Sequence, residues 1–228
     1  MKELCQLAGN WDGRTVPAAA MIEPKLDGFR MLWLRDWEGR PTLRTRNGYS
    51  FEGVAHIAHE LAAWERHAGA PWVFDGEFCV GDGPDTLART KAWCEREHKL
   101  GGVAGRLFLF DGMPLSDWMA GGCDVPLWQR KAKLERIALA VKSDAAHAWD
   151  WRPGSRGADD GASPVELVAS AEAWHVDDVI EQAGAIWQAG GEGVVVKNPF
   201  APYRRSRSMD WLKCGRPWRD KVQWKRAA

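Results

Sequence analysis

The sequence predicts an α+β fold in which mainly antiparallel sheets carry helices on their outer faces. Three strand-like apolar runs follow one another near the N-terminus with no helix between them, at residues 18–22, 29–35 and 42–46. A doubly wound parallel fold needs a helix after each strand, so this order disfavours it. Helical periodicity then predicts four helices, at residues 54–67, 84–100, 126–142 and 177–189.

Composition places the chain among globular proteins. Hydrophobic residues make up 45% of its 228 residues and charged residues 27%, which is enough apolar material for a sizeable core. No apolar run approaches the roughly 18 residues of a membrane span, and the N-terminus lacks the apolar core of a signal peptide. The five cysteines are odd in number and widely spaced. We therefore expect a cytoplasmic protein with reduced thiols and no membrane association. We also expect a monomer, although the cysteines and the hydropathy do not bear on this.

Charge is unevenly distributed although the formal net charge is zero. Nine Lys/Arg and two Asp lie between Tyr203 and Ala228, so this segment carries +7 and the rest of the chain −7. A basic segment on an acidic body suggests a polyanion partner. The alternative is a solvated tail, but the interleaved aromatic residues Tyr203, Trp211, Trp218 and Trp224 argue against it.

The turn between the first two strands holds Lys25-Leu26-Asp27-Gly28-Phe29-Arg30. Charged groups beside buried strands are costly unless they are paired or used. Partial desolvation and the neighbouring Arg30 would lower the pKa of Lys25 and make it a candidate nucleophile. A surface Lys–Asp turn is the alternative, and the hexapeptide alone does not separate the two.

Two further patterns place charged residues beside or within predicted strands. Thr45-Arg46-Asn47-Gly48 forms a tight turn whose arginine could bind phosphate, although a solvated hairpin arginine is commoner. In the next predicted strand, residues 72–80, Asp75 and Glu77 lie two apart and share one face. Paired carboxylates suit a divalent metal or a ribose hydroxyl, and a solvent-facing strand edge is the alternative.

The second half alternates strands and helices less regularly. Residues 106–111 read as a buried strand in which Phe108 and Phe110 share a face, where an aromatic ring could stack on a purine or simply pack in the core. Residues 126–142 read as an amphipathic helix. The remaining expectations are a strand around Trp149 and Trp151, a flexible loop at residues 152–164, and short strands at residues 165–169, 192–197 and 211–213. Glu192 and Lys197, at the ends of one strand, should lie beside one cavity.

The absence of several well-known sequence motifs narrows the range of reactions that the chain could catalyse. The chain has no G-x-x-x-x-G-K-[ST] loop and no convincing G-x-G-x-x-G turn after a strand. It also lacks H-E-x-x-H and G-x-S-x-G. The recurring pattern is a lysine close in sequence to an Asp or Glu. This pattern suits phosphoryl transfer, in which the protein positions the reactants, neutralises charge and binds a metal.

The ordered set KLDGFR, TRNG, FDGEF, LFLFD, EGVVVK and WLK resembles the covalent nucleotidyltransferases. It is most similar to the adenylation domain of ATP-dependent DNA ligases, especially small phage and bacterial ones, and the resemblance spans residues 21–216. The resemblance implies a nucleotidyltransferase (ATP-grasp-like) core. It also implies a polynucleotide ligase that uses ATP with Mg²⁺, or Mn²⁺ in its place, and seals nicked duplex DNA in replication, repair or recombination.

The same resemblance implies a role for each matched residue. Lys25 would attack the α-phosphorus of ATP and carry AMP, and Asp27 would organise the site. Glu23 would read adenine, Arg30 would hold the ribose and Phe110 would stack on the base. Glu77 and Glu192 would bind the metal, with Glu77 also near the ribose, and Lys197 and Lys213 would contact the α-phosphate. Arg46 would bind the 5′-phosphate of the nick, and the nucleic-acid set is completed by Arg205, Arg207 and Arg216.

The sequence departs from the family pattern in two places. The last motif usually reads Lys-x-Lys, whereas here Gly215 follows Lys213-Cys214 and Arg216 comes next. Family members also continue into an OB-fold domain of roughly 100 residues. We therefore expect an adenylation domain at residues 1–216, a basic C-terminal tail at residues 217–228 and no OB-fold domain. A separate OB-fold or clamp protein could supply the missing function.

Other functions remain open on the sequence alone. An RNA ligase or a capping-type nucleotidyltransferase would share the lysine chemistry. A two-metal nuclease could use Asp75, Glu77, Asp111 and Glu192. A non-catalytic nucleic-acid-binding relic could keep the fold without turnover. None of these explains both Lys25 and the ordered set of motifs.

Overall fold

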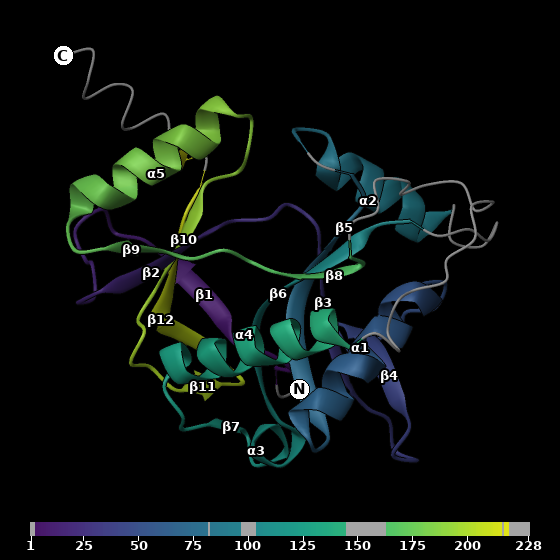
Figure 1. Cartoon of the computed structure of the whole chain (residues 1–228). Coiled ribbons are helices and arrows are strands. Elements are labelled where there is room, and N and C mark those ends of the chain that lie inside the picture. The colour runs from purple at the N-terminus through teal and green to yellow at the C-terminus, as the bar shows by residue number, and fades with distance from the viewer. Residues whose placement is uncertain (1–2, 82, 97–103, 145–162, 216, 219–228) are drawn as a thin grey trace.

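The computed structural model describes residues 3–81, 83–96, 104–144, 163–215 and 217–218. Two five-stranded sheets stand next to each other, and the helices cover their outer faces (Figure 1). The first sheet has the order β1 (Leu7–Asn10), β12 (Arg207–Cys214), β10 (Val194–Lys197), β2 (Ala20–Pro24) and β9 (Ala171–Ala173). The second sheet has the order β4 (Pro41–Thr45), β3 (Phe29–Arg35), β5 (Trp72–Cys79), β6 (Arg106–Pro114) and β8 (Val165–Leu167).

Neighbouring strands in both sheets are antiparallel except for the pairs β1–β12 and β6–β8. A short ribbon pairs β11 (Tyr203–Arg204) with β7 (Gly122–Cys123). The helices are α1 (Ala55–Ala68), α2 (Thr86–Glu95), α3 (Leu115–Met119), α4 (Leu127–Ser143) and α5 (Val176–Gln188). The predicted α+β architecture of mainly antiparallel sheets with outer helices is therefore confirmed.

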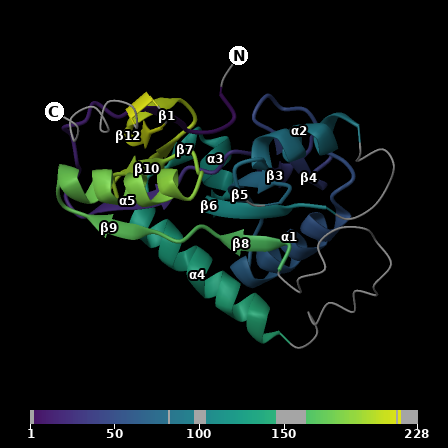
Figure 2. The ribbon, with the colours of Figure 1, turned by 90° about the horizontal axis from the view of Figure 1, so that it is seen from above.

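Each sheet has its own hydrophobic core. Apolar residues of α5, such as Val179, pack against Ile22 and Val194 of the first sheet. Apolar residues of α1 and α4 pack against the second sheet, with Leu61 and Leu134 in one cluster. Figure 2 shows α4 running along the molecule beneath both sheets, which places it where it can contribute to a site between them.

A third cluster joins the two sheets. It contains Leu32 and Val73 from the second sheet, Trp211 from the first, and Tyr203 from the short ribbon, all of them buried. Strands β2 and β3, which belong to different sheets, are connected by the turn that carries Lys25. The chain thus crosses from one sheet to the other at the predicted nucleophile.

Most predicted elements are found with boundaries shifted by one to three residues, and β6 and β12 extend further than predicted. Helix α2 begins at Thr86, two residues later than the predicted start at residue 84, and residues 97–100 of the predicted helix lie outside the described residues. The predicted strand around Trp149 and Trp151 and residues 152–162 of the predicted loop lie outside the described residues. In the part of the chain that is described, no helix is long and apolar enough to span a membrane.

Candidate active site

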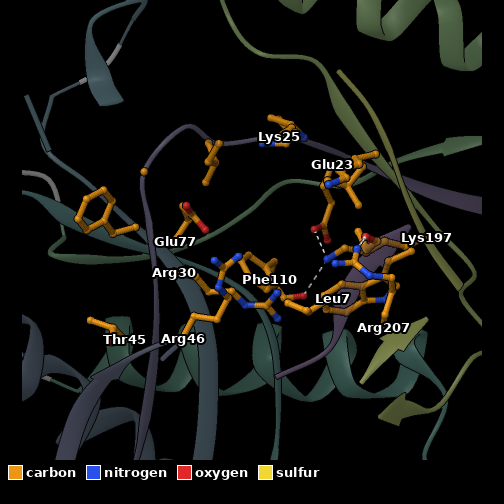
Figure 3. Close-up of a pocket in the computed structure, with 18 of the residues that line it drawn as sticks. Leu7, Glu23, Lys25, Arg30, Thr45, Arg46, Glu77, Phe110, Lys197 and Arg207 are labelled. Carbon is orange, nitrogen blue, oxygen red and sulfur yellow. Dashed lines mark hydrogen bonds and ion pairs between the residues drawn. The ribbon is translucent and has the colours of Figure 1, made fainter. Parts of the chain in front are cut away.

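A cavity of about 610 Å³ opens between the two sheets and gathers most of the predicted site residues (Figure 3). We call it the inter-sheet cavity. Its lining includes the predicted residues Glu23, Lys25, Arg30, Arg46, Glu77, Phe110, Lys197, Arg207 and Lys213. A second cavity, of about 840 Å³, is lined by Asp27 and Glu192. Lys25 and Lys213 line both cavities, so these two lysines stand where the cavities meet.

Strand pairing fixes Lys25 beside Glu192. Pro24 pairs with Val194 in the β2–β10 ladder, and the Lys25 main-chain N–H donates to the Gly193 carbonyl at 2.8 Å. The Lys25 ammonium forms an ion pair with the Glu192 carboxylate, with the two side chains 25% and 22% exposed. Trp187 Nε1 donates to the Glu192 carbonyl at 3.0 Å and holds that end of the strand. The amine is therefore both anchored and accessible.

Two glycines allow this close approach. A Cβ at Gly28 would lie 2.2 Å from the Phe78 carbonyl oxygen, so the Lys25 turn can pass next to β5 only with glycine at this position. Gly193 has φ of 135°, and a Cβ there would lie 2.1 Å from the Cys214 carbonyl oxygen. The glycines of KLDG and EGVVVK thus serve backbone packing around the lysine.

Glu23 forms a buried cluster with two lysines. Its Oε2 accepts a hydrogen bond from Lys197 Nζ at 2.5 Å, and its Oε1 accepts from Lys131 Nζ at 2.7 Å and from Ser170 Oγ at 3.0 Å. All three charged side chains are 2–3% exposed. Burial lowers the pKa of Lys197 below its ordinary value, and the Glu23 carboxylate opposes that shift. Two ammonium groups share one carboxylate, which leaves an excess of positive charge.

Aromatic rings line the same region. Lys197 Nζ lies 4.7 Å from the centroid of the Phe110 ring and 4.2 Å from that of Trp211. Asp111 pairs with Asp75 and Leu109 with Gly76, so Phe110 is left without a partner in the β5–β6 ladder. Such a bulge re-aims a side chain, and Phe110 lines the cavity (Figure 3).

Arg30 and Glu77 face each other across the β3–β5 ladder. Arg30 is held by Asp75, with Nε–Oδ1 of 2.8 Å and Nη2–Oδ2 of 2.5 Å. Burial raises the pKa of Glu77 to about 7, although Arg30 and Lys25 act in the opposite direction. Asp75 and Glu77 therefore both lie toward the interior, and the alternative of a solvent-facing strand edge is wrong.

The donor chemistry of Glu77 and Glu192 fits Mg²⁺. Both supply carboxylate oxygens, each in one of the two cavities that meet at Lys25. Mg²⁺ is usually bound by one or two carboxylates together with water and phosphate. Among the described residues no group of three or more His, Cys, Asp or Glu is arranged to hold a metal by itself.

The predicted nucleic-acid residues separate in space. Arg46 and Arg207 are exposed and line the inter-sheet cavity. Arg205 lies 3.9 Å from the centroid of the Trp118 ring and donates to the carbonyls of Glu3 and Trp118 at 3.1 and 3.3 Å. Arg205 thus also secures the N-terminal segment. Arg216 lies outside the described residues.

One expectation about carboxylates is wrong, and one alternative is excluded. Glu192 and Lys197 lie on different cavities, because Lys197 turns inward to Glu23 whereas Glu192 meets Lys25 before β10 begins. The nuclease set also fails. Asp75 is held by Arg30, and Asp111 is held by Arg130 at 2.8 and 2.7 Å with no solvent exposure.

Sequence reasoning missed Lys131, Trp211 and the role of Asp75. Lys131 follows Leu127 by four residues and precedes Leu134 by three, so it stands on the buried stripe of α4. A lysine on the otherwise apolar side of a predicted helix is the sequence signal that could have identified Lys131. The sequence places Trp211 in WLK and among the aromatic residues of the basic segment, but it does not show that the Trp211 ring contacts both Lys197 and Arg30.

The fold is that of the nucleotidyltransferase domain of DNA ligases. The ATP-dependent DNA ligase of bacteriophage T7, solved in complex with ATP, superposes with a TM-score of 0.67 at 16% identity over 92% of this chain and 68% of that one. The model of the ATP dependent DNA ligase domain family matches residues 12–214. The chain belongs to this family.

Curated relatives agree with this assignment. A multifunctional non-homologous end joining protein, LigD, of Pseudomonas aeruginosa is 31% identical over 196 residues, which cover 84% of this chain. A DNA ligase of Halobacterium salinarum is 25% identical over 205 residues, or 85% of this chain. The chain spans 19% and 32% of the lengths of these two proteins.

Proposed function

We propose that this domain transfers AMP from ATP to Lys25 and then passes it to the 5′-phosphate of nicked duplex DNA, so that the nick is sealed. The observation that carries the proposal is the Lys25 amine at the junction of two cavities, one of them lined by an aromatic residue and several cations. Family membership supports ATP as the nucleotide and DNA as the acceptor.

In the first step the Lys25 Nζ lone pair attacks the α-phosphorus of ATP, and pyrophosphate leaves with the electrons of the broken P–O bond. The amine must first lose its proton. The Glu192 carboxylate contacts Nζ and can accept that proton. The product is a phosphoramidate between Lys25 and AMP.

The second and third steps follow from the chemistry of a nick. A terminal 5′-phosphate has no good leaving group, so AMP must be attached to it before a 3′-hydroxyl can displace anything. An oxygen of the 5′-phosphate attacks the α-phosphorus of the adenylate and Lys25 leaves. The 3′-hydroxyl then attacks the 5′-phosphorus and AMP leaves. Arg46 and Arg207, which are exposed at the cavity, would hold phosphate oxygens.

The cavity residues would stabilise the nucleotide during these steps. Phe110 and Trp211 would face the base, Glu23 would accept from its exocyclic amine, and Arg30 and Glu77 would meet the ribose. Lys197 and Lys213 would neutralise charge that develops on the non-bridging oxygens, and Asp27 would organise the second cavity. Bound Mg²⁺, or Mn²⁺, held by Glu77 and Glu192 would supply further neutralisation of phosphate charge.

The domain division belongs to the same proposal. Residues 1–216 form the adenylation domain and residues 217–228 a basic tail that contacts DNA. Arg205 extends the phosphate contacts beyond the cavity, and Arg216, which lies outside the described residues, would also bind phosphate. The domain acts as a monomer, and addition of an OB-fold or clamp protein would increase nick sealing.

The experiment is incubation with α-labelled ATP and Mg²⁺ followed by denaturing electrophoresis. Wild type should retain label and Lys25→Ala should retain none, because the covalent bond is lost with the amine. Lys142→Ala, which removes an exposed lysine on α4, is the matched control and should label like wild type. Label on the Lys25→Ala protein would contradict the proposal.

Two further arms separate related activities. Label from ATP but not from GTP distinguishes adenylation from capping-type guanylylation. Sealing of nicked DNA but not of nicked RNA distinguishes a DNA ligase from an RNA ligase. A folded wild type that binds nicks and takes no label would be a non-catalytic binding module.

A further inference from the structure

A buried chain of hydrogen bonds connects Arg30, on the wall of the inter-sheet cavity, to Tyr203. The two bonds from Arg30 fix the guanidinium against the Asp75 carboxylate. The Tyr203 hydroxyl donates to Asp75 Oδ2 at 2.6 Å, so it shares this oxygen with Arg30 Nη2. Asp75 and Tyr203 are both 0% exposed. The orientation of a cavity arginine is thus tied to a phenol that has no contact with solvent.

The direction of the Tyr203 hydrogen bond is determined by its other partner. The Gln6 main-chain N–H donates to the phenol oxygen at 3.1 Å. The phenol has one proton, and a carboxylate can only accept, so this proton goes to Asp75. Burial raises the pKa of Tyr203 well above its ordinary value, and the phenol therefore keeps its proton at neutral pH.

Gln6 closes the chain into a ring. Its carbonyl accepts from Arg30 Nη1 at 2.6 Å, so Arg30, Asp75, Tyr203 and Gln6 each bond to the next. Arginine carries five N–H donors in a rigid fork, and these bonds use one N–H each on Nε, Nη1 and Nη2. The remaining N–H groups are those that a bound molecule can meet, and their direction depends on the whole ring.

We propose that Tyr203 is a positioning residue for Arg30, and that its hydroxyl sets the guanidinium in the orientation that bonds the ribose hydroxyls of the nucleotide. The inference rests on the proposed function, in which Arg30 meets the ribose. Tyr203 itself touches no part of the nucleotide, because it is fully buried and absent from the cavity wall. Without the hydroxyl, the Asp75 carboxylate loses one of its donors and can turn together with Arg30.

The test is calorimetric titration of the whole chain with AMP and with 2′,3′-dideoxy-AMP. Neither ligand carries a pyrophosphate leaving group, so binding is measured without covalent chemistry. Tyr203→Phe should weaken AMP binding about fivefold to tenfold, as expected for one misplaced hydrogen-bonding group. Binding of the dideoxy compound should not change, because it offers no ribose hydroxyl. The preference of wild type for AMP should therefore largely disappear in the variant.

A matched control removes the same kind of interaction elsewhere. Ser208 Oγ donates to Asp210 Oδ2 at 2.7 Å, a hydroxyl-to-carboxylate bond outside the cavity wall. Ser208→Ala should keep the wild-type ratio of the two affinities. Arg30→Lys keeps the charge but loses the fork, and it should reduce the ratio like Tyr203→Phe. The double variant should be no worse than Arg30→Lys alone, because Tyr203 acts through Arg30.

Three results would overturn the inference. These are an unchanged ratio in Tyr203→Phe, an equal loss of affinity for both ligands, and additive losses in the double variant. A wild type that shows no preference for AMP, or no binding, would overturn it as well. The adenylation assay is independent of this outcome. Labelled Lys25 with an unchanged ratio refutes only the role of Tyr203, and a ribose-dependent ratio without label refutes only the proposed activity.

Discussion

The Glu23 carboxylate is shared by two buried ammonium groups, and this imbalance gives the wall of the inter-sheet cavity at Glu23 a positive potential. Lys131 and Lys197 both donate to it, and none of the three side chains is more than 3% exposed. A buried charge is costly unless it is compensated. The cluster therefore keeps an excess positive charge in a region of low dielectric, where it attracts an anionic ligand more strongly than a solvated lysine would.

This arrangement predicts a large loss of stability for Glu23→Gln. The substitution keeps the side-chain volume but leaves two buried ammonium groups without a counter-charge. The free energy of unfolding should fall by about 3–5 kcal/mol, measured by urea denaturation. Glu181→Gln, at an exposed position on α5, is the control and should change stability by less than about 0.5 kcal/mol. A loss below about 1 kcal/mol at Glu23 would mean that the lysines are neutral or solvated.

At the scale of elements, α4 illustrates what periodicity can predict. Residues 126–142 were predicted to form an amphipathic helix, and the apolar residues Leu127, Leu134, Ile137 and Val141 of α4 are all buried. Arg130 and Lys131 are buried on the same helix and were not identified, because hydropathy counts charged residues as exposed. Their partners, Asp111 and Glu23, lie on strands distant in sequence, and only the tertiary structure brings them together.

Short strands were missed for a related reason. β9 has three residues and forms because it lies beside β2, and β1 has four residues and pairs with β12 some two hundred residues away. Such segments carry too little local pattern to be predicted. The longer elements were predictable because turn residues such as Asn47-Gly48 and Gly190-Gly191 mark their ends.

Docking of α1 gives a pH-dependent prediction. His56, in the first turn of α1, is 5% exposed, and its Nε2 lies 3.1 Å from the Gly105 carbonyl oxygen just before β6. Burial lowers the pKa of His56 below the ordinary value of 6.5. Between the lowered pKa of the folded state and pH 6.5, the unfolded chain therefore binds more protons at this position than the folded chain does. Folding stability consequently falls as the pH decreases, and it is retained above pH 6.5.

Urea denaturation between pH 5 and pH 8 tests this prediction. His56→Gln removes the titrating group, so wild type should lose stability more steeply than the variant on the acid side. The difference in slope should be at most about 1.4 kcal/mol per pH unit, the value for one proton. His59→Gln, on the same helix, is the comparison for a histidine that is not fully buried. Parallel curves for wild type and His56→Gln would show that His56 does not couple helix docking to pH.

At the scale of the whole molecule, the inter-sheet cavity is built from segments that span nearly the entire chain. Leu7 and Lys213 both line it, and Glu23, Glu77 and Phe110 come from three strands in two sheets. The identity of many of these residues was predictable from the order of the motifs. Their contacts were not, because the Glu23 cluster and the Asp75–Tyr203 bond depend on how the two sheets are joined.

The basic C-terminal segment joins this architecture through Trp218. The Trp218 ring lies 5.3 Å from that of Trp11, and its Nε1 donates to the Trp11 carbonyl at 2.9 Å. A Cβ at Gly13 would lie 2.3 Å from the Trp218 ring, so the loop after β1 fits closely around it. A truncation that tests the charge of the tail must therefore keep Trp218, since removing it would also remove this packing.

Deletion of residues 219–228 meets that requirement and removes four Lys/Arg and one Asp. If these cations bind DNA phosphates, log K for nicked duplex DNA should fall less steeply with log salt concentration in the truncated protein. The slope should decrease by about 0.9 for each phosphate that the tail no longer neutralises, so by up to about 3.6. Fluorescence anisotropy between about 50 and 200 mM salt measures it. A cooperative thermal transition serves as the control that the truncated protein is folded. An unchanged slope in a folded truncation would mean that the tail does not bind DNA and that the arginines around the cavity carry the phosphate binding.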